Sequence, residues 1–275
     1  MELTNQPNQV KMKLLRISTF LLLSIIIPIA RAGDTVKIMP VGNSITAGEH
    51  YGFPAVEERT GYRKALYDML TDNGYHVDFV GSQNHGMRPE DTDGWFDWNC
   101  EAYPGWKIPA IAERVEVALP KYNPDILLAH VGTNGRDWGD KPAQVNHMLD
   151  IINEYSVEAD HSVTVLLSLI INRYNGGHAA STQFNRELAK KVAARTGDKI
   201  KILLVDMETG AGLDYSDKPP DPDAVPPYAG GDMWGETYKG VAYDKYHPND
   251  KGNKKMAIKY YEKLVKVLPE PSACK

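Results

Sequence analysis

A serine, an aspartate and a histidine stand in two distant segments of the chain, in a combination that suits catalysis. Ser44 lies in VGNSITAG, and Asp244 and His247 lie in YDKYHPND. A serine hydroxyl becomes a good nucleophile only when a neighbouring imidazole takes its proton. The imidazole needs a carboxylate on its other ring nitrogen, which fixes its tautomer and stabilises its charged form. These residue types therefore predict acyl transfer through a covalent intermediate.

Acyl transfer also requires hydrogen-bond donors that face the oxyanion of the tetrahedral intermediate. The segment VGTNGRDW contains Asn134, whose side-chain amide is such a donor, and the backbone N–H of Ser44 and a glycine N–H are others. Taken alone, Ser44 and Asn134 are also ordinary turn residues. Likewise, Asp244 has a simpler explanation as a surface carboxylate, and His247 as a helix-entry residue. Their combination on one scaffold favours an active site.

The residues that position these side chains alternate between predicted strands and predicted helices. Apolar runs predict strands at residues 36–41, 76–81, 125–131, 163–171 and 200–205. Apolar residues at helical spacing predict helices between them and a last helix over about residues 249–267. The pattern predicts an α/β protein in which a five-stranded parallel sheet lies between two helical layers.

Ligand sites in sheets of this kind lie beyond the carboxyl ends of the strands. Ser44 directly follows the first predicted strand, and Asn134 follows the third. Asp244 and His247 precede the last predicted helix. The predicted sheet therefore brings the candidate residues to one edge.

Four segments of the chain resemble the conserved blocks of the SGNH (GDSL-type) hydrolases: VGNSITAG, EAYPGWKI, VGTNGRDW and YDKYHPND. The run KIMPVGNSIT followed by PGWKI is most similar to the carbohydrate esterase family 3 acetylxylan esterases. The resemblance spans residues 36–264. It implies a three-layer α/β/α, flavodoxin-like fold, a Ser–His–Asp triad and no cofactor. The matching positions are Ser44, Asp244 and His247 for the triad, and Ser44, Gly105 and Asn134 for the oxyanion hole.

Two positions depart from the family pattern, and one spacing separates the chain from another class of hydrolase. Asn43 and Gly135 stand where the family usually has aspartate. Neither belongs to the triad or the oxyanion hole, so we expect them to change rate and pH dependence rather than the reaction class. Thr46 occupies the place of the second glycine of G-x-S-x-G, which argues against the nucleophile elbow of ordinary α/β-hydrolases.

Two long segments, residues 83–107 and 210–243, fall outside the alternation of strands and helices. Loops of this length in a compact domain usually bind ligands or lack order. Aromatic rings in them either stack on sugar rings or hold their own loops against the body. The candidates for sugar contact are Trp95, Trp98, Tyr228 and Trp234.

The chain shows no metal-ligand spacing among its histidines or cysteines. His130 lies inside a predicted strand, where a core histidine is expected. The loop at residues 210–243 carries five aspartates, which either hold calcium or remain solvated, and their spacing matches no EF-hand loop. Cys100 and Cys274 form a disulfide if they meet in space, which the sequence does not decide.

The chain has 275 residues, of which 42% are hydrophobic and 24% charged, a composition that fits one sizeable globular domain. Residues 1–32 resemble a signal peptide, with a basic stretch, an apolar stretch and the small-x-small sequence Ala30-Arg31-Ala32. We therefore expect a secreted or periplasmic hydrolase domain at residues 33–275.

The formal charge of this domain would be −8, against −5 for the whole chain. An acidic protein is not expected to bind nucleic acid or anionic lipid, and neutral substrates fit it better than polyanions.

Three functions remain open at the level of sequence. The first is an esterase that removes small acyl groups, acetyl among them, from polysaccharide or oligosaccharide. The second is a lipid esterase or thioesterase with the same machinery, although no long apolar loop is visible to hold a fatty chain. The third is a glycan-binding protein that has lost catalysis. This hypothesis is suggested by Asn43 and Gly135, which depart from the family pattern. Chain-length dependence and turnover would distinguish them.

Overall fold

The computed structural model describes most of the chain after residue 33. The described residues are 34–50, 54–88, 96–173, 179–216, 231–233, 237–238, 241–242, 244 and 246–271. The predicted signal peptide lies outside them, so it and the domain boundary at residue 33 stay predictions. Within the described part of the chain, no helix combines the length and the apolar character that a membrane span requires.

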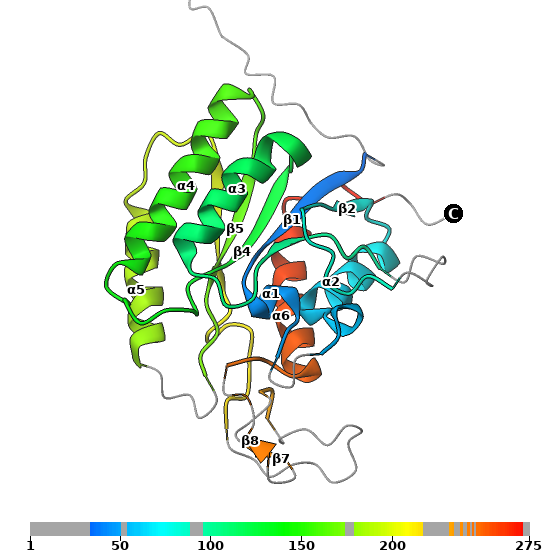
Figure 1. Ribbon diagram of the computed structural model, residues 1–275. Coiled ribbons are helices and arrows are strands. Elements are labelled where there is room, and N and C mark those ends of the chain that lie inside the picture. Colours follow the sequence, from blue (N-terminus) through cyan, green and yellow to red (C-terminus); the bar gives the residue numbers. More distant parts are fainter. Residues whose placement is uncertain are drawn as a thin grey trace, which may run out of the picture. The chain divides into compact units, whose positions relative to one another are not determined.

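A parallel sheet forms the centre of the described structure (Figure 1). The strands β1 (Val36–Gly42), β2 (Val77–Phe79), β4 (Ile126–His130), β5 (Thr164–Leu169) and β6 (Lys201–Asp206) lie in the order β2-β1-β4-β5-β6. All neighbouring pairs are parallel. The five predicted strands are therefore confirmed. A sixth strand, β3 (Glu101–Ala102), pairs with the end of β1 and was not predicted, because two residues show no periodicity.

The order of the strands creates a point from which the chain leaves in opposite directions. From β1, the chain first adds β2 on one side and later β4 on the other. In open α/β sheets, such a switch point opens a crevice beyond the carboxyl ends of the two strands. Ser44 follows β1 and Asn134 follows β4, so both candidates lie at this crevice.

Two helical layers cover the sheet, as expected (Figure 1). On one face lie α3 (Ile108–Tyr122), α4 (Lys141–Glu158) and α5 (Ala179–Ala193), and on the other lie α2 (Gly61–Asp72) and α6 (Asp250–Leu264). Successive side chains of a strand point to opposite faces. Leu127 therefore packs in the core under the first group of helices, and Leu128 packs in the core under the second. Burial on both faces explains why these strands are almost wholly apolar.

Four short elements complete the described fold and were not predicted. They are α1 (Ser44–Ala47), the 3₁₀ helix η1 (Val56–Glu58), and the strands β7 (Thr237–Tyr238) and β8 (Val241–Ala242), which pair as an antiparallel hairpin. Each is too short to leave a periodic pattern in the sequence. Two of them nevertheless bear on the site, because α1 begins with Ser44 and β8 ends two residues before Asp244.

His130, at the end of β4, is fully buried, as expected for a core histidine. The backbone N–H of Ile171 donates to its Nε2 over 3.2 Å, so the ring is neutral and carries its proton on Nδ1. Nδ1 has no hydrogen-bond partner among the described residues. Burial lowers the pKa of His130 to about 4. A buried imidazole of this kind resists protonation as long as the protein stays folded.

Replacing His130 with glutamine should flatten the dependence of stability on acidity. In the unfolded chain a histidine has a pKa of about 6.5. Since the folded value is lower, the unfolded chain takes up the proton first as the pH falls, and stability is lost between about pH 6.5 and pH 4. The wild type should lose about 1.4 kcal/mol per pH unit more than His130→Gln in this window. Urea unfolding at pH 7.0, 6.0 and 5.0 measures both slopes, and equal slopes would contradict the expectation.

Candidate active site

Ser44 stands at the first position of α1, directly after a tight exit from β1. The side chain of Asn43 caps this short helix by accepting a hydrogen bond from the backbone N–H of Ile45 over 3.2 Å. A Cβ atom on Gly42 would lie 2.1 Å from Thr46 Oγ1, which no real contact allows. Only glycine therefore permits this sharp strand-to-helix turn, which places the serine hydroxyl at the carboxyl edge of the sheet.

A chain of hydrogen bonds joins the three predicted triad residues. Ser44 Oγ lies 2.7 Å from His247 Nε2, and His247 Nδ1 is hydrogen-bonded to Asp244 Oδ2. Because the carboxylate can only accept, Nδ1 carries the proton and the lone pair of Nε2 faces the serine hydroxyl. The structure thus brings all three residues into the arrangement that a serine nucleophile requires.

The carboxylate of Asp244 is held by its own turn. Its Oδ1 accepts hydrogen bonds from the backbone N–H groups of Tyr246, over 2.8 Å, and His247, over 3.1 Å. The Asp244 side chain is 2% exposed, whereas that of His247 is 18% exposed. The aspartate is therefore a fixed, buried anchor, and the imidazole keeps access to the pocket.

The segment after His247 leads into α6. The structure begins this helix at Asp250, with Asn249 as its N-cap, so His247 lies before the cap rather than within the helix. Asn249 Oδ1 accepts from the backbone N–H of Gly252 over 3.1 Å, and its Nδ2 donates to the carbonyl of Gly231 over 3.0 Å. One buried asparagine thus ties the turn that carries the histidine to both the helix and the long loop before it.

Asn134 lies in the turn after β4, and a buried lysine supports this turn from within. Lys141 Nζ donates to the carbonyls of Gly132, over 2.7 Å, and Gly135, over 3.1 Å. The same ammonium lies 3.2 Å from the centre of the Trp138 ring, which adds a cation–π contact. A lysine in the first turn of a helix opposes the helix dipole. Its contacts with the Asn134 turn explain why it stands there.

The Asn134 side chain retains one donor for a ligand. Its Nδ2 donates to the carbonyl of Trp106 over 3.0 Å, and an amide nitrogen carries two hydrogens. Gly105, the other predicted oxyanion residue, precedes Trp106 and adopts a positive φ of 77°. The two predicted donors therefore belong to contacting loops, although Gly105 is not among the residues that line the pocket at Ser44.

A pocket of about 570 Å³ opens over the serine. It is lined by Ser44, residues 133–136, Trp138, Arg173, Tyr246 and His247. A volume of this size accepts a small ligand such as one or two sugar units. Ser44, His247 and the Asn134 turn meet in this one pocket, as predicted from the carboxyl-end rule.

Arg173, Tyr246 and Trp138 line the pocket but were not singled out from the sequence. Arg173 follows β5 closely, and the rule that places ligand sites beyond strand ends would have found it. Tyr246 stands inside YDKYHPND, between the triad aspartate and histidine. Trp138 ends VGTNGRDW. For Tyr246 and Trp138 the signal was nearness to a predicted catalytic segment, and for Arg173 it was the end of a predicted strand.

The predicted sugar contacts are only partly within the described structure. Trp95, Tyr228 and Trp234 lie outside the described residues. Trp98 is described, and its carbonyl accepts a hydrogen bond from Arg63 over 2.7 Å. It is not among the residues that line the pocket at Ser44. Its backbone therefore helps to hold its own loop against the body, while its role toward a sugar stays a prediction.

The acidic loop and the cysteines are likewise partly described. Asp232 accepts hydrogen bonds from the backbone N–H of Asp214 and from Lys255 Nζ, both over 2.5 Å, which gives it a structural role. The other three aspartates of the predicted cluster lie outside the described residues. Among the described residues, no group of three or more acidic, histidine or cysteine side chains forms a metal site. Cys100 is a buried free thiol, and Cys274 lies outside the described residues.

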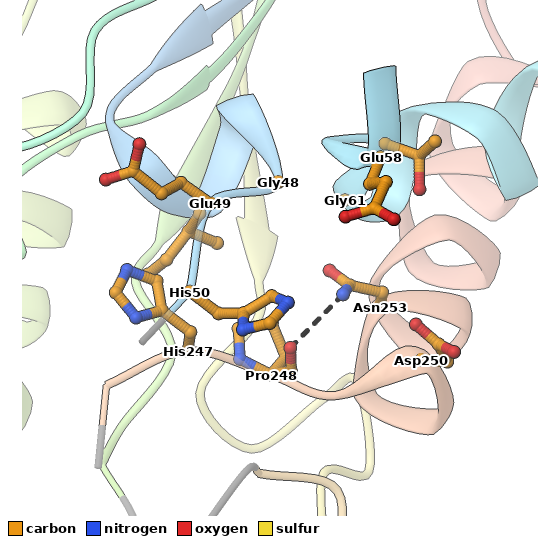
Figure 2. A pocket seen from close by; sticks show the side chains of 11 residues that line it. Gly48, Glu49, His50, Glu58, Gly61, His247, Pro248, Asp250 and Asn253 are labelled. Atoms are coloured by element: carbon orange, nitrogen blue, oxygen red, sulfur yellow. Dashed lines mark hydrogen bonds between the residues drawn. The ribbon is translucent and has the colours of Figure 1, made fainter. Parts of the chain in front are cut away.

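A second, much smaller pocket of about 50 Å³ also borders His247 (Figure 2). The ends of α1 and η1 and the start of α6 line it, and its volume suits water rather than a sugar. Figure 2 shows the carboxylates of Glu49 and Asp250 on opposite sides, so they do not converge on one point. Glu49 pairs with Arg59 over 2.8 Å. This pocket is therefore too small for a substrate and lies beside the turn that carries His247.

Arg63 in α2 holds the serine helix in place and was not predicted. It is completely buried, and its guanidinium donates only to backbone carbonyls. The acceptors are Thr46 at 2.8 Å, Ala47 at 3.1 Å, Arg59 at 2.7 Å, His85 at 2.8 Å and Trp98 at 2.7 Å. Two of these carbonyls belong to α1, so the arginine fixes the short helix that begins with Ser44.

The two departures from the family pattern have local structural explanations. Asn43 is fully buried and its Oδ1 caps α1, whereas its Nδ2 has no partner within the described part of the chain. Gly135 adopts a positive φ of 85°, a conformation that side chains rarely tolerate. Glycine is therefore the natural residue at 135 in this chain, and the turn that carries Asn134 depends on it.

The chain is similar in sequence to one curated protein. The sequence matches no protein-family model. It is 28% identical over 250 residues to a multidomain esterase from Ruminococcus flavefaciens, in an alignment that covers 80% of this chain and 31% of that protein. The chain thus spans about a third of the length of the curated relative that it matches.

Two solved esterases have a similar fold. A carbohydrate esterase family 3 structure from Talaromyces cellulolyticus matches with a TM-score of 0.62 and 24% identity, covering 86% of this chain and 100% of that chain. A family 3 carbohydrate esterase from Clostridium thermocellum matches with a TM-score of 0.58 and 23% identity, covering 85% and 97%. The three-layer α/β/α fold predicted from the sequence is therefore confirmed as the fold of these esterases.

Removing the Arg63 guanidinium should destabilise the protein strongly. Arg63→Met leaves five carbonyls without their donor, and breaking a buried charged network of this kind costs about 3–5 kcal/mol. The free energy of unfolding in urea measures the loss. The matched control is Arg186→Met on the exposed side of α5, which should change stability by less than about 0.5 kcal/mol. A loss below about 1 kcal/mol for Arg63→Met would show that the network is not a support.

Asn43→Asp should leave the protein active but alter its rate or pH profile. The aspartate keeps an oxygen that caps α1, whereas its charge would lie buried beside the nucleophile. The measurement is kcat/KM for a simple ester between pH 5 and pH 9 in the wild type and the variant. Asn43→Ala serves as the control for loss of the cap, at a stability cost of about 1 kcal/mol. Complete loss of activity in folded Asn43→Asp would show that this position is misjudged.

Proposed function

We propose that this protein is a serine carboxylic ester hydrolase that removes small acyl groups, acetyl among them, from carbohydrate. The observation that carries the proposal is the hydrogen-bond chain from Ser44 through His247 to Asp244, which opens into the same pocket as Asn134. The fold shared with family 3 carbohydrate esterases supports it.

In the first half of the proposed reaction, Ser44 Oγ attacks the carbonyl carbon of the ester while its proton passes to His247 Nε2. Asp244 stabilises the resulting imidazolium without taking the proton. The negative charge that develops on the carbonyl oxygen is met by the free hydrogen of the Asn134 amide and by backbone N–H groups of Ser44 and Gly105. Collapse of the intermediate breaks the ester bond, and the leaving sugar hydroxyl takes the proton from Nε2.

In the second half, water replaces the sugar. His247 Nε2 removes a proton from the water as its oxygen attacks the acyl-enzyme, and the same proton returns to Ser44 Oγ when the acid leaves. The exposure of the imidazole allows this, since its side chain is 18% exposed while the aspartate behind it is buried. Each step uses residues already in place, so the mechanism needs no cofactor.

The character of the pocket favours a carbohydrate over a long acyl chain. Its wall carries polar and cationic side chains together with the rings of Trp138 and Tyr246. Such polar and cationic groups can bind the hydroxyl groups of a sugar, whereas a fatty chain needs a continuous apolar channel. A lipid esterase or thioesterase therefore fits this pocket less well. We also propose that the protein is exported, on the composition of residues 1–32.

Replacing the nucleophile should abolish turnover. Ser44→Ala is expected to lower kcat for 4-nitrophenyl acetate by at least about 10³-fold, because no other group at the site can form the acyl-enzyme. Initial rates at 405 nm measure the loss, and acetate release from acetylated xylan tests the carbohydrate substrate. Ser216→Ala, the same change at an exposed turn serine, should retain the wild-type rate. Equal rates for wild type and Ser44→Ala would refute the proposed function, and glycan binding without turnover would favour a non-catalytic protein.

A further inference from the structure

Arg173 places a cation inside the pocket that contains the nucleophile. It lies just beyond the carboxyl end of β5 and lines the pocket together with Ser44 and His247. Its guanidinium lies 4.6 Å from the centre of the Tyr246 ring and 5.9 Å from the centre of the Trp138 ring. Two aromatic faces therefore hold the guanidinium in position, which lowers the entropy that it would lose on binding a ligand.

Arg173 has no acidic partner in the described part of the chain. No salt bridge or side-chain hydrogen bond of its guanidinium occurs there, and its buried Nε has no acceptor. Burial lowers the pKa of Arg173, and only Tyr246 acts in the opposite direction. A partly desolvated cation without a counter-charge costs free energy, so proteins usually supply an anion for it.

The carboxylates near the pocket are engaged elsewhere. Asp244 is bound to His247 and to the backbone of its turn. Glu208 accepts hydrogen bonds from Asn172, over 3.2 Å, and from Asn185, over 2.8 Å. Asp137 is exposed to solvent. None of them neutralises Arg173.

Further positive charge surrounds the same pocket. Arg136 lines it, and Lys141 lies under the Asn134 turn. Burial and, after it, the neighbouring charge of Arg173 together lower the pKa of Lys141 to about 8. The pocket is therefore locally cationic in a chain whose formal net charge is −5. Because charges are screened beyond about 8 Å in physiological salt, the local charge and not the net charge decides what the pocket attracts.

We propose that Arg173 binds a carboxylate of the substrate, so that the enzyme deacylates sugars that are, or directly adjoin, uronic acids. This inference rests on the proposed esterase function and adds the substrate class to it. The planar guanidinium matches a carboxylate through two parallel hydrogen bonds. Since Ser44 and Arg173 share one pocket of about 570 Å³, the ester and the carboxylate lie on the same sugar or on neighbouring sugars. The expectation of neutral substrates from net charge does not extend to this pocket.

Three matched probes test the proposal. They are the singly O-acetylated methyl glycosides of a uronic acid, of its methyl ester and of the corresponding neutral hexose, prepared in both the glucose and the galactose series. The probes differ only at C6, which is a carboxylate, an ester or a hydroxymethyl group. The ratio of kcat/KM for the uronate to that for its methyl ester reports recognition of the charge. Because it is a ratio within one protein preparation, it does not depend on the fraction of active enzyme.

The wild type should prefer the uronate by about 10- to 100-fold in at least one series, as expected for hydrogen bonds to a charged group. Arg173→Gln should bring the ratio close to one, mainly through KM, and Arg173→Lys should retain part of the preference. Arg186→Gln removes the same charge from the exposed side of α5 and should leave the ratio unchanged. Raising NaCl from 0.05 to 0.5 M should reduce the preference of the wild type.

The possible failures are distinguishable from one another. If the wild type hydrolyses none of the probes and no other acetyl ester, the proposed function itself is wrong. If it hydrolyses the probes without preference for the uronate in either series, the assignment to Arg173 is wrong while the esterase function stands. A preference that survives in Arg173→Gln would also overturn the assignment. Should this variant fail to fold, Arg173→Lys and the salt dependence of the wild type give the same decision.

Discussion

The guanidinium of Arg63 makes the contacts on which the position of Ser44, the proposed nucleophile, depends. It reaches five backbone carbonyls in four separate stretches of chain and is itself completely buried. No carboxylate is among these acceptors. The carbonyls at the end of a short helix carry partial negative charge, so α1 serves as part of the counter-charge. A buried cation thus replaces the intrahelical bonds that a helix of four residues is too short to make.

The same solution recurs on the other side of the crevice. Lys141 donates to the two carbonyls that flank Asn134, as Arg63 donates to carbonyls of the helix that carries Ser44. Ser44 and Asn134, the proposed nucleophile and oxyanion donor, therefore lie on irregular backbone whose carbonyls accept hydrogen bonds from buried cations. Rigid support of this kind is what a preorganised site requires, since displacement by about 1 Å is enough to reduce catalysis. Unlike Arg63 and Lys141, Arg173 has no hydrogen-bond acceptor for its side chain among the described residues.

Local sequence pattern was sufficient to predict the strands and the three residues of the Ser44–His247–Asp244 hydrogen-bond chain, but not the residues that support them. The strands over residues 126–130 and 164–169 are apolar because both of their faces are covered, so their positions follow from the sequence. Asp244 and His247 are close in the chain, and their contact follows from a single turn. The acceptors of Arg63 range from Thr46 to Trp98, and no periodicity links them. Such contacts depend on how the elements pack, which propensity does not specify.

The bond between Ser44 and His247 joins residues that are 203 positions apart. Its two halves are also linked through the core, where Thr46 shares a hydrogen bond with Tyr62 over 3.3 Å and Tyr62 packs against Tyr260 at 4.9 Å between ring centres. During synthesis, the serine segment therefore leaves the ribosome long before the histidine segment can reach it. In a nascent chain the proposed triad therefore cannot form until α6 docks against α2, and the proposed activity would appear only when folding is complete.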